Sequence, residues 1–181
     1  MRFKKVTAVL LALAVAAVPV APVFAEGDEY VTPVTLPAQV SPIELDSNSY
    51  WHVDGIRIDN VVRVLDSGTV PGVVGPFMVA RVVAEVLGLN FGWAQNENGV
   101  VTSFFYNDEV RMEFTHGSAM AWVERNGVRT PTQIFIQGVV PAQMQVIEGR
   151  TFVPVQFFDA IFPGSVVWND LDQSVFLFPL Q

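Results

Sequence analysis

Cysteine is absent from all 181 residues of the sequence. Without a thiol the chain has no disulfide framework, no thiolate metal site, no cysteine nucleophile and no cysteine for lipid attachment. Histidine is nearly absent too, since His52 and His116 are the only two and neither has an acid or a histidine four residues away. A copper or zinc site would need ligands at such spacings, or both histidines converging with carboxylates. We therefore expect no metal site and no cofactor, with both imidazole rings partly exposed beside strands or turns.

Lysine occurs only at the N-terminus, where a basic stretch precedes an apolar run from Val6 to Val20. Small residues follow and end at Ala25, before an acidic residue. This order of regions is typical of a secretory signal peptide, so we predict that residues 1–25 are a signal peptide cleaved after Ala25. The alternative is a transmembrane anchor. Pro19 and Pro22 disfavour it, because they interrupt a run that is already short of the roughly 20 residues that a membrane span needs.

Positive charge is scarce once the predicted signal peptide is removed. The remaining chain has 7 arginines, no lysine and 18 acidic residues, which gives a formal net charge of −11. An acidic surface of this kind repels nucleic acid and anionic lipid. We therefore expect no nucleic-acid partner and, after signal cleavage, no membrane partner. We expect a secreted or extracellular protein, with association with the cell wall as a further expectation.

Proline is concentrated in the segment that follows the predicted signal peptide. Residues 26–50 contain Pro33, Pro37 and Pro42 without a helical period, which predicts an extended linker with one edge strand. The folded domain is then expected to span residues 51–181. About half of the chain is apolar (51%), which is enough for a core of ordinary size.

Two segments predict short, largely buried helices. The first, "GPFMVARVVAEVLG", has Pro76 at the first helical position and Gly88 as a stop. Arg81 and Glu85 lie four residues apart and are its only charged residues, so they mark one exposed stripe. The second segment, "FVPVQFFDAIFPG", is predicted to begin its helix at Pro154 and to end at a Pro-Gly pair.

The two helical segments belong to a pattern that runs twice through the chain. Phe77 and Trp93 are sixteen residues apart, as are Phe152 and Trp168, so the two copies align at a shift of 75 residues. Hairpin signals precede each helix, and a strand, a tryptophan and a polar turn follow it. Because a short antiparallel sheet needs one face covered, we predict an α+β fold of two tandem half-repeats, each a small curved antiparallel sheet packed on one helix. The half-repeats span about residues 51–106 and 107–181.

The second copy carries an ordered set of short motifs. They are Asn126-Gly127, Gly149-Arg150-Thr151, Val153-Pro154-Val155 and Trp168-Asn169-Asp170. In this order the motifs resemble the stalk domain of secreted and cell-surface bacterial proteins, also called the copper amine oxidase N-terminal-like domain. The first half matches more loosely, with Pro76 and Trp93 but without the Arg-Thr pair, and Gln156 stands where the family usually has arginine.

The resemblance implies antiparallel sheet curved around a helix, in tandem copies. It also implies a non-catalytic module that spaces or attaches other domains at a Gram-positive-type surface. The resemblance implies no copper site, because in the oxidases the copper lies in another domain.

Four residues are candidates for binding: Trp93, Trp122, Trp168 and Arg150. Tryptophans exposed beside acids and amides can stack on sugar rings. The alternative is that Trp93 and Trp168 occupy equivalent core positions, each packed on the helix of its own half. Arg150 is expected either to bind an anion at the start of a helix or to pair with a neighbouring acid, while Thr151 caps the helix.

Acidic residues are concentrated at turns, in "YNDE" (106–109) and "NDLD" (169–172). Neither segment fits a calcium-binding loop, and asparagine and aspartate are favoured by turns, so we interpret both as turns, with calcium binding as the alternative. The chain has no Gly-x-Ser-x-Gly motif, and paired carboxylates for glycoside cleavage are an alternative that the sequence leaves open.

We therefore predict that the protein is not an enzyme. The predicted function is that of a non-catalytic secreted stalk-like module, with a structural or protein-interaction role at the bacterial cell envelope. Its partner is expected to be an envelope protein or a cell-wall polymer. The alternative is a carbohydrate or cell-wall binding module that uses exposed tryptophans.

Overall fold

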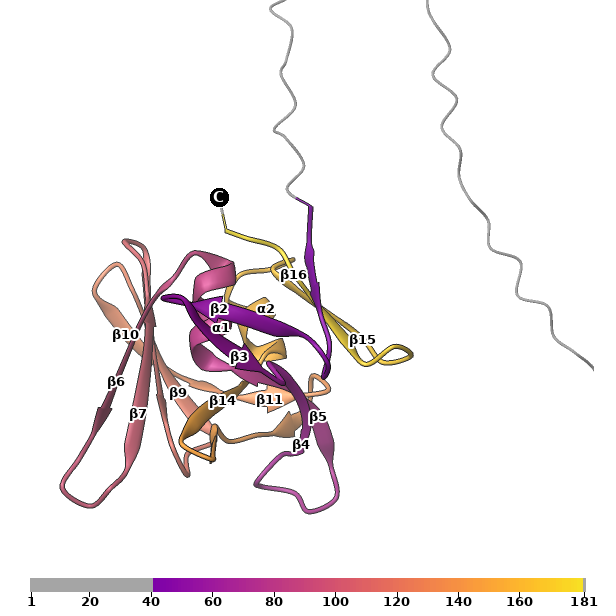
Figure 1. Cartoon of the computed structure of the whole chain (residues 1–181). Helices are drawn as coiled ribbons and strands as arrows, with labels where there is room; N and C mark the ends of the chain where they lie inside the picture. Colours follow the sequence, from indigo (N-terminus) through magenta and orange to yellow (C-terminus); the bar gives the residue numbers. More distant parts are fainter. Residues whose placement is uncertain (1–40, 181) are drawn as a thin grey trace, which may run out of the picture. The chain divides into compact units, whose positions relative to one another are not determined.

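The computed structural model describes residues 41–180 (Figure 1). This part of the chain contains sixteen strands and two short helices, and the strands account for 51% of it. The helices are α1 (Ala80–Leu87) and α2 (Gln156–Ile161), and neither is long and apolar enough to cross a membrane. The predicted signal peptide and most of the predicted linker lie outside the described residues.

The largest sheet is a curved antiparallel meander in the order β10-β9-β8-β7-β6. Its strands are β6 (Asn90–Gln95), β7 (Val101–Tyr106), β8 (Val110–Thr115), β9 (Met120–Arg125) and β10 (Val128–Gln133). Asn126 and Gly127 join β9 to β10 with φ angles of 51° and 75°. Positive φ at both central residues is what a two-residue hairpin turn requires, so the predicted Asn-Gly turn is confirmed here.

A second sheet has the order β13-β14-β5-β4. It consists of β13 (Gln145–Ile147), β14 (Arg150–Pro154), β5 (Val74–Val79) and β4 (Val62–Asp66). At its centre β5 and β14 pair antiparallel, with Met78 opposite Val153. These two residues are also equivalent at the 75-residue shift, so the two matching segments pair with each other around a local twofold axis.

The prediction that each half-repeat has its own sheet is wrong. Strands β7 and β8 pair directly across the expected boundary between residues 106 and 107. The sheet centred on β5 and β14 likewise takes strands from both halves. Helices of eight and six residues are too short to cover a separate sheet each, and pairing across the halves removes strand edges that would otherwise be exposed.

The prediction that Pro76 and Pro154 begin helices is also wrong. Pro76 lies in β5 and Pro154 is the last residue of β14, and each helix starts only after the strand ends. A continuous apolar run fits a buried strand as well as a buried helix, and pairing between the two copies decides in favour of strands. The helix stop at Gly88 is confirmed, since this residue adopts a left-handed conformation (φ 74°) and donates its N–H to the carbonyls of Ala84 and Glu85. The charged side chains of α1 are exposed, as predicted.

The remaining strands form small sheets and hairpins. They are β1 (Ile43–Leu45), β2 (Tyr50–Val53), β3 (Ile56–Asp59), β11 (Phe135–Ile136), β12 (Val140–Pro141), β15 (Val166–Asn169) and β16 (Ser174–Leu177). Strand β1 pairs with β16, and its Leu45 is buried. The folded part therefore begins before residue 51, and the edge strand expected in the linker belongs to it.

Phenylalanines join the second helix to the largest sheet. Phe158 of α2 lies with its ring centroid 5.0 Å from that of Phe105, and Phe157 lies 5.1 Å from Phe114. All four side chains are fully buried. Edge-to-face contacts of this kind add to the burial of apolar area. They fix the sheet against α2 and thereby position its edge strand β6, which carries Trp93.

Candidate binding groove

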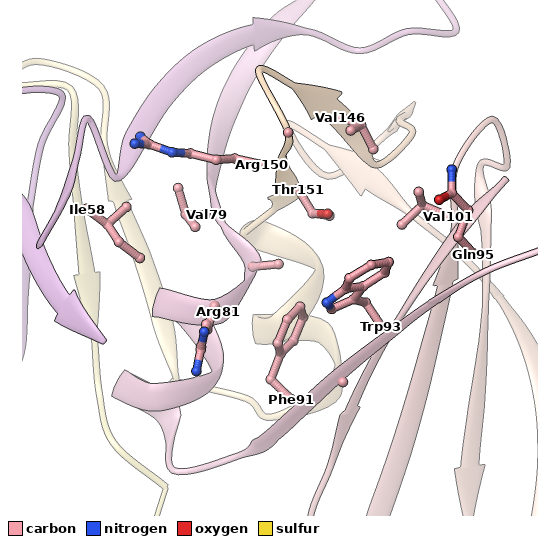
Figure 2. Close-up of a pocket in the computed structure, with 13 residues that line it drawn as sticks. Ile58, Val79, Arg81, Phe91, Trp93, Gln95, Val101, Val146, Arg150 and Thr151 are labelled. Carbon is pink, nitrogen blue, oxygen red and sulfur yellow. The ribbon is translucent and has the colours of Figure 1, made fainter. Parts of the chain in front are cut away.

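A groove in the described part of the chain has a volume of about 640 Å³ (Figure 2). Its lining residues are Ile58, Val79, Ala80, Arg81, Phe91, Gly92, Trp93, Gln95, Val101, Val146, Gly149, Arg150 and Thr151. Two of the four predicted binding residues, Trp93 and Arg150, thus meet in one groove although they are far apart in sequence. In Figure 2 Trp93 lies on one side and Arg81 and Arg150 lie on the other, with Val79 between the two arginines and Phe91 between Arg81 and Trp93.

Trp93 is placed on the groove by the register of β6. Trp93 lies opposite Ser103 of β7. The Ser103 side chain is buried, and residues directly opposite each other point to the same face, so the Trp93 side chain is on the face of the sheet that covers the core. The side chain is nevertheless 65% exposed. The expectation that Trp93 packs in the core is therefore wrong. Strand β6 is the edge of its sheet, and no other strand of residues 41–180 pairs with its outer edge.

Arg150 borders the groove from the first position of β14. Its Nη1 donates a hydrogen bond of 3.0 Å to the backbone carbonyl of Asp59. Within the described part of the chain no carboxylate lies within 4.0 Å of the Arg150 guanidinium, so the expected ion pair is not found there. Thr151 does not cap a helix, because it lies in β14 opposite Val146. In Figure 2 the Arg150 side chain extends away from Trp93, so its positive charge lies at the margin of the groove.

Arg81 is a groove residue that the sequence analysis did not single out. It lies in the first turn of α1 and forms an ion pair with Asp54 in which both side chains are exposed. Exposed pairs of this kind contribute little, about 0–1 kcal/mol, so Arg81 can exchange Asp54 for another anion. The lining thus holds two arginines and no acidic residue, in a chain whose formal net charge is −8. Helical spacing predicted that Arg81 is exposed, but no sequence signal placed it beside Trp93.

The other predicted tryptophans lie elsewhere. Trp122 is 44% exposed, lies opposite Glu113, and has the guanidinium carbon of Arg129 4.8 Å from its ring centroid. The cross-strand partners of Trp122 are, in order, Glu113, Phe104 and Gly92, and these residues share one face of the sheet. Successive residues of a strand point to opposite faces, so Trp93, which follows Gly92, lies on the other face. Trp168 is partly buried against the core and lies on β15 of a different sheet. The three tryptophans therefore form no common platform.

The acidic segments behave as turns. In the first, the Asn107 carboxamide oxygen accepts backbone N–H bonds from Glu109 (3.0 Å) and Val110 (2.9 Å). In the second, Asn169 accepts one from Leu171 at 3.1 Å. Among residues 41–180 no three histidine, aspartate or glutamate side chains lie close enough together to hold a metal ion. Both histidines are exposed.

Two carboxyl groups have lowered pKa values, and both belong to turns outside the groove. The Ser49 hydroxyl lowers the pKa of Asp46 by donating a hydrogen bond of 2.6 Å, and the backbone N–H groups of Asn48 and Ser49 add to this effect. Backbone N–H groups of Gly68 and Gly72 lower the pKa of Asp66. Hydrogen bonds to the charged form favour ionisation, so these carboxylates stabilise the turns in which they lie.

The fold and the groove together define a mostly antiparallel β module with an open, cationic groove. A family model described as "Copper amine oxidase N-terminal domain" matches residues 75–177, from β5 to β16, and the chain belongs to this family. The resemblance of the second-copy motifs is thereby confirmed. The family is that of a non-catalytic accessory domain. Comparison with curated proteins gives no match, and comparison with solved structures gives none either.

Proposed function

We propose that this chain is a secreted, non-catalytic stalk-like module that binds an anionic component of the bacterial cell envelope. The groove lined by Trp93, Arg81 and Arg150 is the proposed site. The observation that carries the proposal is the composition of this groove. A chain with a formal net charge of −8 lines this groove with a 65% exposed tryptophan and two arginines, and the lining residues include no acid.

The lining of the groove favours binding over catalysis. It contains no aspartate, glutamate or histidine that would donate or accept a proton near pH 7. Its two arginines stay protonated and bind anions instead, with planar groups that match a carboxylate or a phosphate. Membership of an accessory-domain family supports the same proposal, which is that the protein is not an enzyme.

The proposed location rests on the N-terminus and on the surface charge. A basic, apolar and small-residue order before Ala25 supports secretion. The tandem arrangement expected of stalk domains is proposed here in an interlocked form, because β5 and β14 pair with each other in one sheet that takes strands from both copies.

A role in protein interaction is a second candidate, supported by the outer face of the largest sheet. Trp122 and Met120 are exposed on this face, and Phe104 lies partly exposed in the same row as Trp122. Arg111 lies over the Phe104 ring, with its guanidinium carbon 4.9 Å from the ring centroid. Aromatic residues beside arginines are enriched in protein interfaces, so this face suits an envelope protein.

The test is co-sedimentation of the purified chain with purified Gram-positive cell walls. We expect Trp93→Ala and Arg150→Gln to reduce the bound fraction strongly, because they remove the exposed ring and the uncompensated charge. Trp122→Ala is the matched control, since it removes an exposed tryptophan from the opposite face of the same sheet. Binding that survives Trp93→Ala but is lost with Trp122→Ala would overturn the groove proposal and favour the outer face. Circular dichroism confirms that each variant is folded.

A further inference from the structure

A second, smaller groove accompanies the first. It has a volume of about 300 Å³ and is lined by Val64, Val74, Gly75, Pro76, Gln137, Trp168, Asp170 and Gln173. Trp168 is the aromatic residue of this groove, and its Nε1 donates a hydrogen bond of 3.3 Å to Asp170. We call it the Trp168 groove, and the larger one the Trp93 groove.

The two grooves occupy equivalent positions in the fold. At the 75-residue shift, Gly149, Arg150, Thr151, Trp93 and Gln95 of the larger groove correspond to Val74, Gly75, Pro76, Trp168 and Asp170 of the smaller one. In each groove a tryptophan from one copy meets the strand of the other copy that leads into a helix. The pairing of Met78 with Val153 explains this exchange, because rotation about the axis through that pair swaps β5 with β14. The two grooves are thus two versions of one site.

Comparison of the two versions separates what they share from what distinguishes them. Both keep a tryptophan, whose flat ring suits the apolar face of a planar or ring-shaped ligand. Their charges differ. Arg150 corresponds to Gly75 and Gln95 corresponds to Asp170, so the Trp93 groove is lined by two cations and the Trp168 groove by one acid and no cation. Arg81 corresponds to Gln156, whose side-chain oxygen accepts a hydrogen bond from the backbone of Gln137. Only the Trp93 groove is therefore suited to an anion.

We infer that the Trp93 groove binds an acidic glycan, that is, a polysaccharide whose sugar rings carry carboxylates. This inference rests on the proposed function of the same groove. Trp93 stacks on the apolar face of one sugar ring, and Arg81 and Arg150, whose side chains point in different directions in Figure 2, bind carboxylates of neighbouring rings by charge-assisted hydrogen bonds. Gln95 and Thr151, which also line the groove, supply polar groups for the sugar hydroxyls. A volume of about 640 Å³ is in the range of sites that hold small ligands, so a short stretch of the polymer fits.

Replacing Asp54 tests whether Arg81 binds the ligand, because a purely structural role of Arg81 predicts no gain in binding. The Asp54 carboxylate forms an ion pair with the Arg81 guanidinium, so a ligand carboxylate has to compete with Asp54 for Arg81. Removing the Asp54 charge releases Arg81 and also lowers the local negative potential. Asp54→Asn is therefore expected to strengthen the binding of an acidic glycan by about two- to threefold, in line with the small energy of an exposed ion pair.

The experiment titrates the purified chain with a hexamer of galacturonic acid and with the same hexamer after reduction of its carboxyl groups, by calorimetry. We expect the acidic hexamer to bind at least tenfold more tightly than the neutral one. Trp93→Ala, Arg150→Gln and Arg81→Gln should each weaken acidic-hexamer binding by about tenfold, the effect of losing one charge-assisted or stacking contact. Trp122→Ala, Arg111→Gln and Trp168→Ala are matched controls outside the Trp93 groove and should change it by less than twofold.

Three results would overturn the inference. The first is equal affinity for the acidic and the neutral hexamer, and the second is an equal loss with Arg111→Gln and Arg150→Gln. The third is tighter binding of poly-glutamate or of a glycerol phosphate polymer, which would identify an acidic protein or a phosphate polymer as the ligand. If walls still bind through Trp93 while the acidic hexamer does not bind, the proposed function stands and only the glycan assignment falls. If neither walls nor hexamers bind, both fall.

Discussion

Replacing Gly75 by alanine is expected to destabilise the protein, although the change adds only one methyl group. A Cβ at this position would lie 2.9 Å from Cβ, 3.0 Å from Cδ1 and 3.1 Å from Cγ2 of Ile136. Ile136 is fully buried in β11, so it has little room to move. Overpacking of this kind costs about 1–3 kcal/mol. The reduced entropy of the unfolded chain offsets about 0.5–1 kcal/mol of it, because glycine loses more freedom on folding than alanine.

The net loss in the free energy of unfolding is then about 0.5–2 kcal/mol, equivalent to a fall in Tm of about 1–8 °C. Urea unfolding followed by far-ultraviolet circular dichroism measures it. Gly92→Ala is the matched control, because the nearest atom to its added Cβ is Cδ2 of Phe104 at 3.9 Å, an ordinary contact. Neither glycine has a positive φ, so alanine at residue 92 is expected to be neutral or to stabilise by about 0.5–1 kcal/mol.

A double-mutant cycle isolates the contact with Ile136. In the Ile136→Ala background, where two of the three close atoms are removed, Gly75→Ala should cost about 1 kcal/mol less than in the wild type. Equal effects of the two glycine substitutions, or an unchanged cost in the Ile136→Ala background, would refute the argument that β5 and β11 are in tight contact.

Three further predictions concern a turn, the core and the tryptophans. Ser49→Ala should raise the pKa of Asp46 toward its usual value in an NMR pH titration, and an unchanged pKa would contradict the hydrogen bond from Ser49. Because the folded-state pKa is lowered, the stability that this carboxylate contributes is present above about pH 4 and is lost as the pH falls below it. Phe158→Ala should cost about 3–5 kcal/mol in urea unfolding, because its fully buried ring packs against three other phenylalanine rings, and a loss under 1 kcal/mol would contradict that packing. Iodide should quench mainly the emission of Trp93 and Trp122, so Trp93→Phe should lower the quenchable fraction, and a fraction that stays the same would mean that Trp93 is shielded.

Local features of the fold could be predicted from the sequence. Gly88 ends the first helix and Asn126-Gly127 forms a hairpin turn, because each requires backbone angles that few other residues adopt. The family could be recognised from the order of short motifs in the second copy. Arg81 could be predicted as exposed from its helical spacing, and Trp93 and Arg150 could be named as candidates for binding.

Other features depend on contacts between distant segments and could not be predicted. Pro76 and Pro154 lie in strands because β5 and β14 pair with each other, and an apolar run alone does not distinguish that pairing from a buried helix. Trp93 is exposed because β6 is an edge strand, which depends on the order of all five strands of its sheet. Trp168 has the equivalent sequence position, yet it is partly buried.

By itself the sequence determined the type of module, its charge, its turns and its residue types, because these depend on composition and on local backbone preferences. The groove was decided only by the tertiary structure. Trp93 and Arg150 line the same groove because β5 and β14, which are equivalent in sequence, pair with each other at Met78 and Val153. This pairing places the tryptophan of each copy against the other copy. The same exchange produces the second groove, and the difference in charge between the two is visible only once the residues that line each of them are known.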